Sequence, residues 1–147
     1  MEKKWVAPGG DLTDAWWVRD QVFTIEQEFS PEIEVDDMDV LAHHVVFYED
    51  GKPIATARTF PETGGNGGET YIIGRVAVLK EHRGGGMGKR LMDAMEEKAR
   101  ELGAKAVLLG AQCRAKGFYE RCGYTDTGEP TYFEEYCEHV DMRKKLD

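Results

Sequence analysis

A glycine-rich loop at residues 83–88 stands directly before a helical stretch, in the run VAVLKEHRGGGMGKRLM. Glycines let the backbone approach a ligand closely and present several N–H groups in one direction. The first turn of the following helix adds its unpaired amides and the positive end of its dipole. Such groups bind phosphate, so the loop predicts a site for a polyanionic ligand.

Three cations crowd the same helix start, namely Arg83, Lys89 and Arg90. Positive side chains at the N-terminal end of a helix oppose its dipole and cost stability unless something compensates them. A bound polyanion would compensate them, so this local conflict favours a functional interpretation. Taken alone, the loop leaves open the alternative of a plain glycine-rich turn that caps a helix.

Two common phosphate-binding motifs do not fit this loop. A Walker A motif would need a glycine at Arg83 and a hydroxyl residue at Arg90, and the sequence has neither. The dinucleotide pattern G-x-G-x-x-G also fails, because its third glycine would fall on Lys89 or Leu91. The loop therefore belongs to another class of polyanion site.

The elements that must position the loop follow from the apolar periodicity. Asp50-Gly51 is the expected turn of a β-hairpin, and Gly103 is the expected end of a helix. The apolar segment 106–112 resembles a central strand covered on both faces and, joined by a helix to 70–79, should lie parallel to it. The expected elements are a strand at 3–7, a helix from 11 to about 28, a hairpin at 42–60, a strand at 70–79, a helix at 87–102, a strand at 106–112, a short helix at about 115–122 and strand-like pieces near 124–127 and 136–143.

The first helix carries two stripes of side chains. A surface helix would not need aromatic residues on a second face, so that face is expected to meet another element or a ligand. The apolar stripe comprises Val18, Val22, Ile25 and Phe29, and the second stripe comprises Trp16, Arg19, Phe23 and Glu26.

Composition and length describe one ordinary globular domain over residues 1–147, with 41% hydrophobic and 32% charged residues. No apolar run approaches the roughly 20 residues that span a bilayer. The first residues lack the pattern of a secretory signal, so we expect a cytoplasmic protein with no membrane partner. The net charge of −9 disfavours nucleic acid as a partner and tolerates cationic amines.

The three cysteines are Cys113, Cys122 and Cys137. Their odd number and their spacing fit neither a disulfide framework nor a paired zinc arrangement. Cys113 and Cys137 lie in strand-like stretches, where a free cysteine usually behaves as a small buried hydrophobic residue, and we favour this interpretation over a catalytic thiol.

Several segments together resemble the GNAT N-acetyltransferase superfamily. Arg83-x-x-Gly86-x-Gly88 after a VAV strand is similar to its acetyl-CoA signature, and residues 118–124 look like its FYExxGF segment with Tyr in place of the last Phe. IGRVAV, AQ at 111–112 and HVDM at 139–142 are similar to the ElaA-like branch, and the resemblance runs from about 18 to 143. The upstream pattern of that branch is matched by Glu26, Gln27, Pro31, Glu34, Asp36, Asp39, Ala42 and His44.

The resemblance implies an α/β (α+β) fold with a mixed, mostly antiparallel twisted sheet, a splayed parallel strand pair at 70–79 and 106–112, and flanking helices. It also implies acetyl-CoA as cosubstrate, with no metal. The pantetheine arm would pair with one strand, the pyrophosphate would bind the loop amides, and two side chains would lie across the splay. The cofactor-binding residues implied in this way are Val76, Ala77, Val78, Arg83, Gly84, Gly85, Gly86, Met87, Gly88, Lys89, Gln112 and Tyr119.

The activity that the resemblance implies is direct acetyl transfer from the thioester to an amine of a small molecule or peptide. The amine must lose a proton and the leaving thiolate must gain one. Tyr119, with a reference pKa of about 10, is the best candidate acid, although it could simply pack on the core. The base is left open between Glu26 and His44, whose reference pKa is about 6.5.

Other polar residues are weaker candidates for a catalytic or substrate-binding role. His43 and His44 should point to opposite faces of their strand, so at most one faces the site. The acidic residues Asp36, Asp37 and Asp39 could bind a cationic substrate or form a solvated loop. His139 is expected to be a strand residue and not a catalyst.

Two rival functions stay open at this point. A non-catalytic acyl-CoA sensor could use the same fold, and an interaction protein could use the loop to bind a partner's phosphate. The segment around Tyr119 and the VAV strand argue against the second, because neither is needed to bind a phosphate. The identity of the amine and the choice between monomer and homodimer are not determined by the sequence.

Overall fold

The computed structural model describes residues 1–30, 36–62, 69–134 and 136–147. It contains an eight-stranded sheet with strand order β1-β2-β3-β4-β5-β8-β6, in which β7 pairs with β8. The strands are β1 (Glu2–Val6), β2 (His43–Glu49), β3 (Lys52–Pro61), β4 (Thr70–Val78), β5 (Ala106–Gln112), β6 (Thr125–Asp126), β7 (Tyr132–Glu134) and β8 (Cys137–Lys145). The α-helices are α1 (Thr13–Arg19), α3 (Met87–Glu101) and α4 (Lys116–Arg121).

The sheet is mixed and mostly antiparallel, as predicted. β4 and β5 form its parallel pair, but they pair only where Thr70–Ile72 meets Ala106–Leu108. Beyond these residues the two strands separate, while β3 continues beside β4 and β8 beside β5. The predicted splayed strand pair is therefore confirmed.

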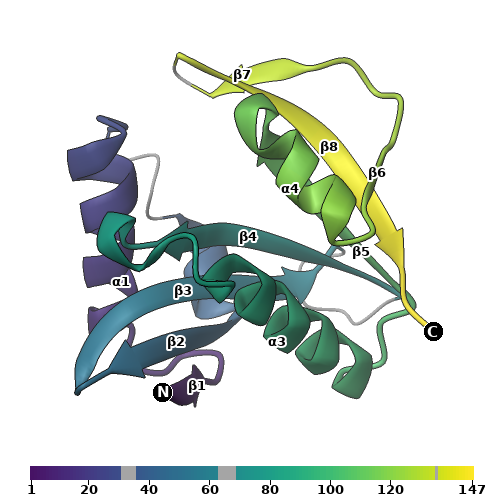
Figure 1. The fold of residues 1–147 in the computed structure, drawn as a ribbon. Coiled ribbons are helices and arrows are strands. Elements are labelled where there is room, and N and C mark those ends of the chain that lie inside the picture. The colour runs from purple at the N-terminus through teal and green to yellow at the C-terminus, as the bar shows by residue number, and fades with distance from the viewer. Residues whose placement is uncertain (31–35, 63–68, 135) are drawn as a thin grey trace.

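Helices cover both faces of the sheet (Figure 1). α3 and α4 pack on one face, where the largest hydrophobic cluster joins them to β2, β3, β4, β5 and β8. α1 lies against β2, β3 and β4 on the other face, and its buried residues belong to two smaller clusters. Among the described residues, no helix has the length and apolar character of a membrane-spanning segment.

Two local predictions are confirmed by the backbone. Asp50 and Gly51, between β2 and β3, both have positive φ angles, 51° and 78°, as a type I′ hairpin turn requires. α3 ends where Gly103 takes a φ of 96°, a left-handed position that favours glycine.

The helix expected from 11 to about 28 changes its winding on the way. α1 ends at Arg19, and residues Asp20–Glu26 form a π-helix, whose hydrogen bonds span five residues instead of four. This shift rotates the later side chains around the axis, so Phe23 is buried while Ile25 is 60% exposed. Ile25, a member of the expected apolar stripe, therefore does not share the buried face with Val18, Val22 and Phe29.

The prediction that β5 is covered on both faces is also wrong. Val107, Leu109 and Ala111 are buried against α3 and α4, whereas Leu108 is half-buried and Gly110 is exposed. In the hydrophobic clusters of the described residues, no helix packs on this second face of β5. The three-residue strand β7, which the sequence did not predict, lies beside β8 next to this face.

β4 bends where it leaves β5. Its register with β3 shifts between Thr56 and Arg58, which places one additional residue on β4 as a β-bulge. Arg75 lies there with a φ of 50°, a left-handed conformation that costs a non-glycine residue about 1–2 kcal/mol. The surrounding contacts must stabilise this bend.

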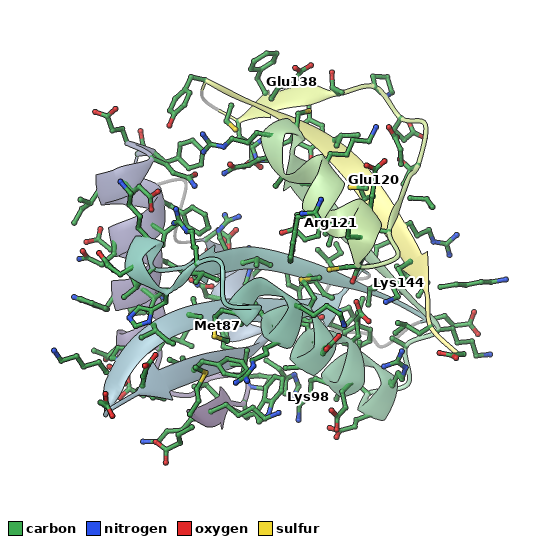
Figure 2. The ribbon with its side chains drawn as sticks, viewed as in Figure 1. Met87, Lys98, Glu120, Arg121, Glu138 and Lys144 are labelled. Carbon is green, nitrogen blue, oxygen red and sulfur yellow. The ribbon has the colours of Figure 1, made fainter. Side chains whose placement is uncertain are left out.

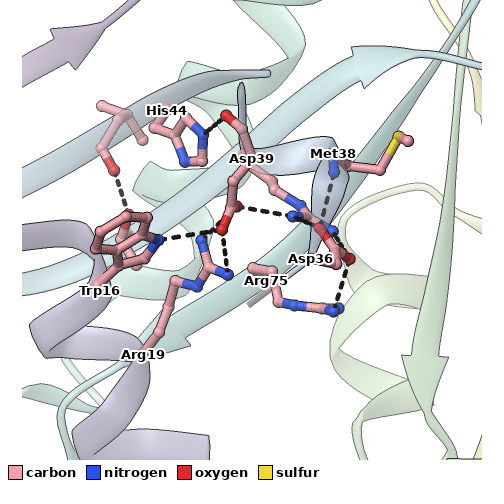
Figure 3. Close-up of polar contacts among 10 residues, drawn as sticks. Trp16, Arg19, Asp36, Met38, Asp39, His44 and Arg75 are labelled. Carbon is pink, nitrogen blue, oxygen red and sulfur yellow. Dashed lines mark hydrogen bonds and ion pairs between the residues drawn. The ribbon is translucent and has the colours of Figure 1, made fainter. Parts of the chain in front are cut away.

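A buried ion-pair network supplies such contacts (Figure 3). Asp39, which is 3% exposed, accepts bonds of 2.8 Å from both Arg19 of α1 and Arg58 of β3. Asp36 binds Arg58 at 2.6 Å and Arg75 at 3.1 Å. The network ties α1 and residues 36–40 to the bulged part of β4.

The network corrects the interpretation of the acidic segment. Asp36 and Asp39 do not bind a cationic substrate, because arginines of the protein itself occupy their carboxylates. Glu34 lies outside the described residues. The second face of the first helix does meet another element, since Trp16 also donates to Asp39 at 3.1 Å.

We predict that Asp39→Asn destabilises the fold by about 3–5 kcal/mol, the usual effect of breaking a buried ion pair. Urea unfolding at neutral pH measures the change. Asp37→Asn is the matched control, because Asp37 is exposed in the same turn, and it should change stability by less than about 0.5 kcal/mol. Equal stability of the two variants would contradict the role given to Asp39.

The same network predicts a pH dependence. Burial alone would raise the pKa of Asp39, but the hydrogen bonds and charge of Arg19 outweigh it and lower the pKa to about 2. A carboxyl with a depressed pKa stabilises the fold above its unfolded pKa of about 3.9. We therefore expect stability to fall between about pH 4 and pH 2, and this acid-dependent loss to shrink in Asp39→Asn.

Candidate active site

A cavity of about 640 Å³ passes through the split between β4 and β5. It lies between the half of the molecule with α1 and β4 and the half with α4 and β8 (Figure 2). Its volume is in the range of small-ligand sites. The residues that line it come from the glycine-rich loop, from the separated edges of β4 and β5, from residues 22–29 after α1, from residues 115–119 at α4, and from β3, β7 and β8 on the far side.

The loop forms one end of the cavity. Gly84 and Gly86 have φ angles of 89° and 82°, and no heavy atom lies within 4 Å of a Cβ built on either. Gly88 differs, because a Cβ there would lie 2.9 Å from the ring of Phe118, so this glycine allows α3 and α4 to approach. The loop residues that line the cavity are Arg83, Gly84, Gly86, Met87, Gly88 and Lys89, without Gly85.

The cations near the loop have partners of their own. Arg83 makes two bonds of 2.6 Å to Glu26, and Lys89 binds Asp93 at 2.8 Å. The expectation that these two cations are uncompensated is therefore wrong. Because these two cations are already paired, anion binding at the loop depends on its backbone amides.

The facing edges of β4 and β5 form the middle of the cavity. Val76, Val78 and Gln112 line it, while Ala77 is buried against Val18 and its neighbours on the α1 face. In the described part of the chain, no strand pairs with β4 on the β5 side beyond Ile72. The backbone of β4 is thus open along this edge.

Tyr119 lines the same cavity from α4. Its ring packs edge-on to Phe118 and Tyr124, with centroids 5.0 and 6.0 Å away. Burial raises the pKa of Tyr119 well above its ordinary value. The raised pKa keeps the phenol protonated, and because no described residue forms a hydrogen bond with its hydroxyl, the proton is available to a ligand.

Neither expected base is placed to act on a substrate. His44 is 1% exposed, does not line the cavity, and its Nε2 lies 3.0 Å from the carbonyl oxygen of Asp39. The carboxylate of Glu26 is held by Arg83 beside a small polar depression, and that hydrogen bond lowers the pKa of Glu26. The geometry argues against both as the proton acceptor.

His139 is the cavity residue that the sequence analysis assigned to structure alone. It is 6% exposed and lines the far side of the cavity, opposite Gln112 on the neighbouring strand. Its neighbours Tyr132 and Glu134 lie on β7, a strand that the sequence analysis did not predict. The signal that could have found it was the family-like HVDM segment at 139–142.

A mixed sheet split at one parallel pair, with a glycine-rich helix start beside the split, is the architecture of this chain, and its similarity to acyl-CoA N-acyltransferases supports the same class of activity. The model of the Acetyltransferase (GNAT) family matches residues 11–124, and the chain belongs to this family, in its ElaA-like branch.

Several known proteins are similar to this chain over almost its whole length. The uncharacterized N-acetyltransferase YjcF of Bacillus subtilis is 35% identical over 133 residues, which are 90% of this chain and 91% of YjcF. The crystal structure of an acyl-CoA N-acyltransferase from Pseudomonas aeruginosa has a TM-score of 0.85 at 28% identity and covers 97% of this chain and 98% of its own. The crystal structure of Escherichia coli ElaA has a TM-score of 0.84 at 26% identity and covers 98% and 99%.

We predict that Gly86→Ala weakens the binding of coenzyme A at least 10-fold, because a side chain at its left-handed φ distorts the loop amides. Gly128→Ala is the matched control, since Gly128 has a φ of 88°, equally open surroundings and no place in the cavity. Both variants should lose about 1–2 kcal/mol of stability from the same strain. Calorimetry should find weaker binding only for Gly86→Ala, and unchanged affinity there would contradict the assignment of the loop.

Proposed function

We propose that this protein is an N-acetyltransferase that moves an acetyl group from acetyl-CoA directly to an amine of a small molecule or peptide. The observation that carries the proposal is the single cavity that joins the glycine-rich loop to the far face of the sheet. A cosubstrate could enter from the loop and an acceptor from the other face, and they would meet at the split. We further propose that residues 1–147 form one domain, since β1 and β8 from the two ends belong to one sheet.

The residues present fit acetyl-CoA. The amides of Gly84–Gly88 would hold its pyrophosphate, the open edge of Val76 and Val78 would pair with its pantetheine arm, and Gln112 would face it across the split. When bound, acetyl-CoA supplies a thioester: a C–N bond forms to the amine, the C–S bond breaks, and the thiolate leaves.

The hydroxyl of Tyr119 suits the leaving-group side of this reaction. Its raised pKa means that it stays protonated throughout the neutral range. It can therefore donate a hydrogen bond to a developing negative charge in the cavity. The same raised pKa means that deprotonation of Tyr119 should not limit the rate below about pH 10.

Incubation of the protein with acetyl-CoA and a panel of amines tests the proposed function. The panel should include polyamines, amino acids, aminosugars and a peptide, with thiol release and the mass of the acetylated amine as readouts. We expect an acetylated product with at least one of them. Tight binding of acetyl-CoA without any acetylated amine would favour a non-catalytic acyl-CoA sensor instead.

We predict that Tyr119→Phe lowers kcat roughly 100-fold and leaves the affinity for acetyl-CoA nearly unchanged, since the ring is kept and one proton donor is lost. Tyr124→Phe is the control: its hydroxyl binds Glu96 at 2.9 Å away from the cavity, so the change should reduce stability and not kcat. Steady-state kinetics and calorimetry measure both effects. If kcat of Tyr119→Phe matches the parent, Tyr119 only packs against the core.

A further inference from the structure

His139 lies on the acceptor side of the cavity. It stands directly across from Gln112 in the antiparallel pair of β5 and β8, so the two side chains share one face of the sheet. Both residues line the cavity, and His139 is otherwise buried. An imidazole in this place contacts the interior of the cavity and is largely shielded from bulk water.

The hydrogen bonds of His139 decide which nitrogen is basic. Nδ1 lies 2.9 Å from the carbonyl oxygen of Cys137, which can only accept, so Nδ1 carries a hydrogen and donates it. In the neutral ring Nε2 then holds the free lone pair. Nε2 lies 3.8 Å from a carboxylate oxygen of Glu134 on β7, so a positive charge on the ring would be stabilised there.

The ring is also held in position from its side. Tyr132 stacks on it, with centroids 5.7 Å apart and an interplanar angle of 18°, and the hydroxyl of Tyr132 donates to Asp141 at 2.8 Å. Gly110 makes room for this arrangement, because a Cβ at that position would collide with the Tyr132 hydroxyl. This explains a glycine in the middle of an apolar strand.

The cavity offers few other proton acceptors. Among the described residues that line it, His139 is the one whose reference pKa, about 6.5, lies near neutrality. Four charged groups surround the imidazole. Glu134 lies beside Nε2, and Asp141 accepts a hydrogen bond from Tyr132, whose ring stacks on the imidazole. Arg58 and Arg75 line the cavity wall formed by β3 and β4. The two carboxylates favour the protonated ring and the two arginines oppose it.

We propose that Nε2 of His139 is the general base that takes a proton from the ammonium group of the acceptor, and that Glu134 is a positioning residue for it. The proton moves from the substrate nitrogen to Nε2, which leaves a neutral amine with a free lone pair and an imidazolium beside Glu134. The imidazolium then returns the proton to solvent. This inference rests on the proposed function, because it assigns the base of that reaction.

The first experiment needs no turnover. NMR titration of the imidazole resonances gives the pKa of His139 in the parent and in Glu134→Gln. Removing the neighbouring negative charge should lower the pKa of His139 and leave His43 unchanged, since His43 does not line the cavity. An unchanged His139 titration would contradict the coupling to Glu134.

Kinetics then test the role of the base, with an amine that the parent acetylates. In the parent, kcat/KM should fall at low pH with the pKa that NMR assigns to His139. In Glu134→Gln this limb should move to lower pH by the same amount. In His139→Gln the limb should disappear and kcat/KM at neutral pH should fall roughly 100-fold, while His43→Gln behaves as the parent.

Two outcomes would overturn the inference while leaving the acetyltransferase itself established. One is a His139→Gln variant with parent activity and the low-pH limb intact. The other is a Glu134→Gln enzyme in which the pKa of His139 shifts but the fall of kcat/KM at low pH stays at the parent's pH. This second test applies even if His139→Gln fails to fold. No acetylation of any amine by the parent would instead overturn the proposed function, and the base assignment with it.

Discussion

The structure depends on the point where β4 and β5 stop pairing. Their parallel ladder ends at Ile72 and Leu108, and from there the edge of β4 has no neighbouring strand on that side in the described part of the chain. Unpaired backbone groups in a protein interior are costly unless something else satisfies them. A ligand that pairs with this edge satisfies them, so the break in the sheet and the cavity through it are one feature.

Each side of the split is held by contacts of its own, and one hydrogen bond crosses it, from the Gln112 amide to Gln27 at 2.8 Å. On one side, the bulge at Arg75 turns β4 away, and Asp36 and Asp39 bind the arginines of β3, β4 and α1 around it. On the other side, β5 pairs with β8 along its full length, from Ala106 to Gln112, and β7 adds the ring of Tyr132. The far end of the cavity is thus built between two walls, one with Arg58 and Arg75 and one with His139.

Local signals in the sequence predicted much of this fold, because their causes are local. Positive φ angles at Gly51 and Gly103 mark a turn and a helix end, and the helical period of 87–102 matches α3. The predictions that failed depend on residues distant in the chain. Glu26 compensates Arg83 from 57 residues away, Arg58 engages Asp39, and β7 is recognisable only beside β8. The charged side chains that suggested a bound cation at Asp36 and Asp39 and a bound anion at Arg83 and Lys89 thus form internal ion pairs, and the anion site at the loop depends on its backbone.

We propose that acyl-CoA binds in the split with its pyrophosphate on the loop. Amide hydrogen exchange with and without coenzyme A tests this directly, because it reports backbone groups one by one. We expect the amides of Gly84–Gly88 and of the β4 edge around Val76 to gain protection together, while the turn at Gly128 does not change. Protection confined to another surface, or to the loop without the β4 edge, would contradict it.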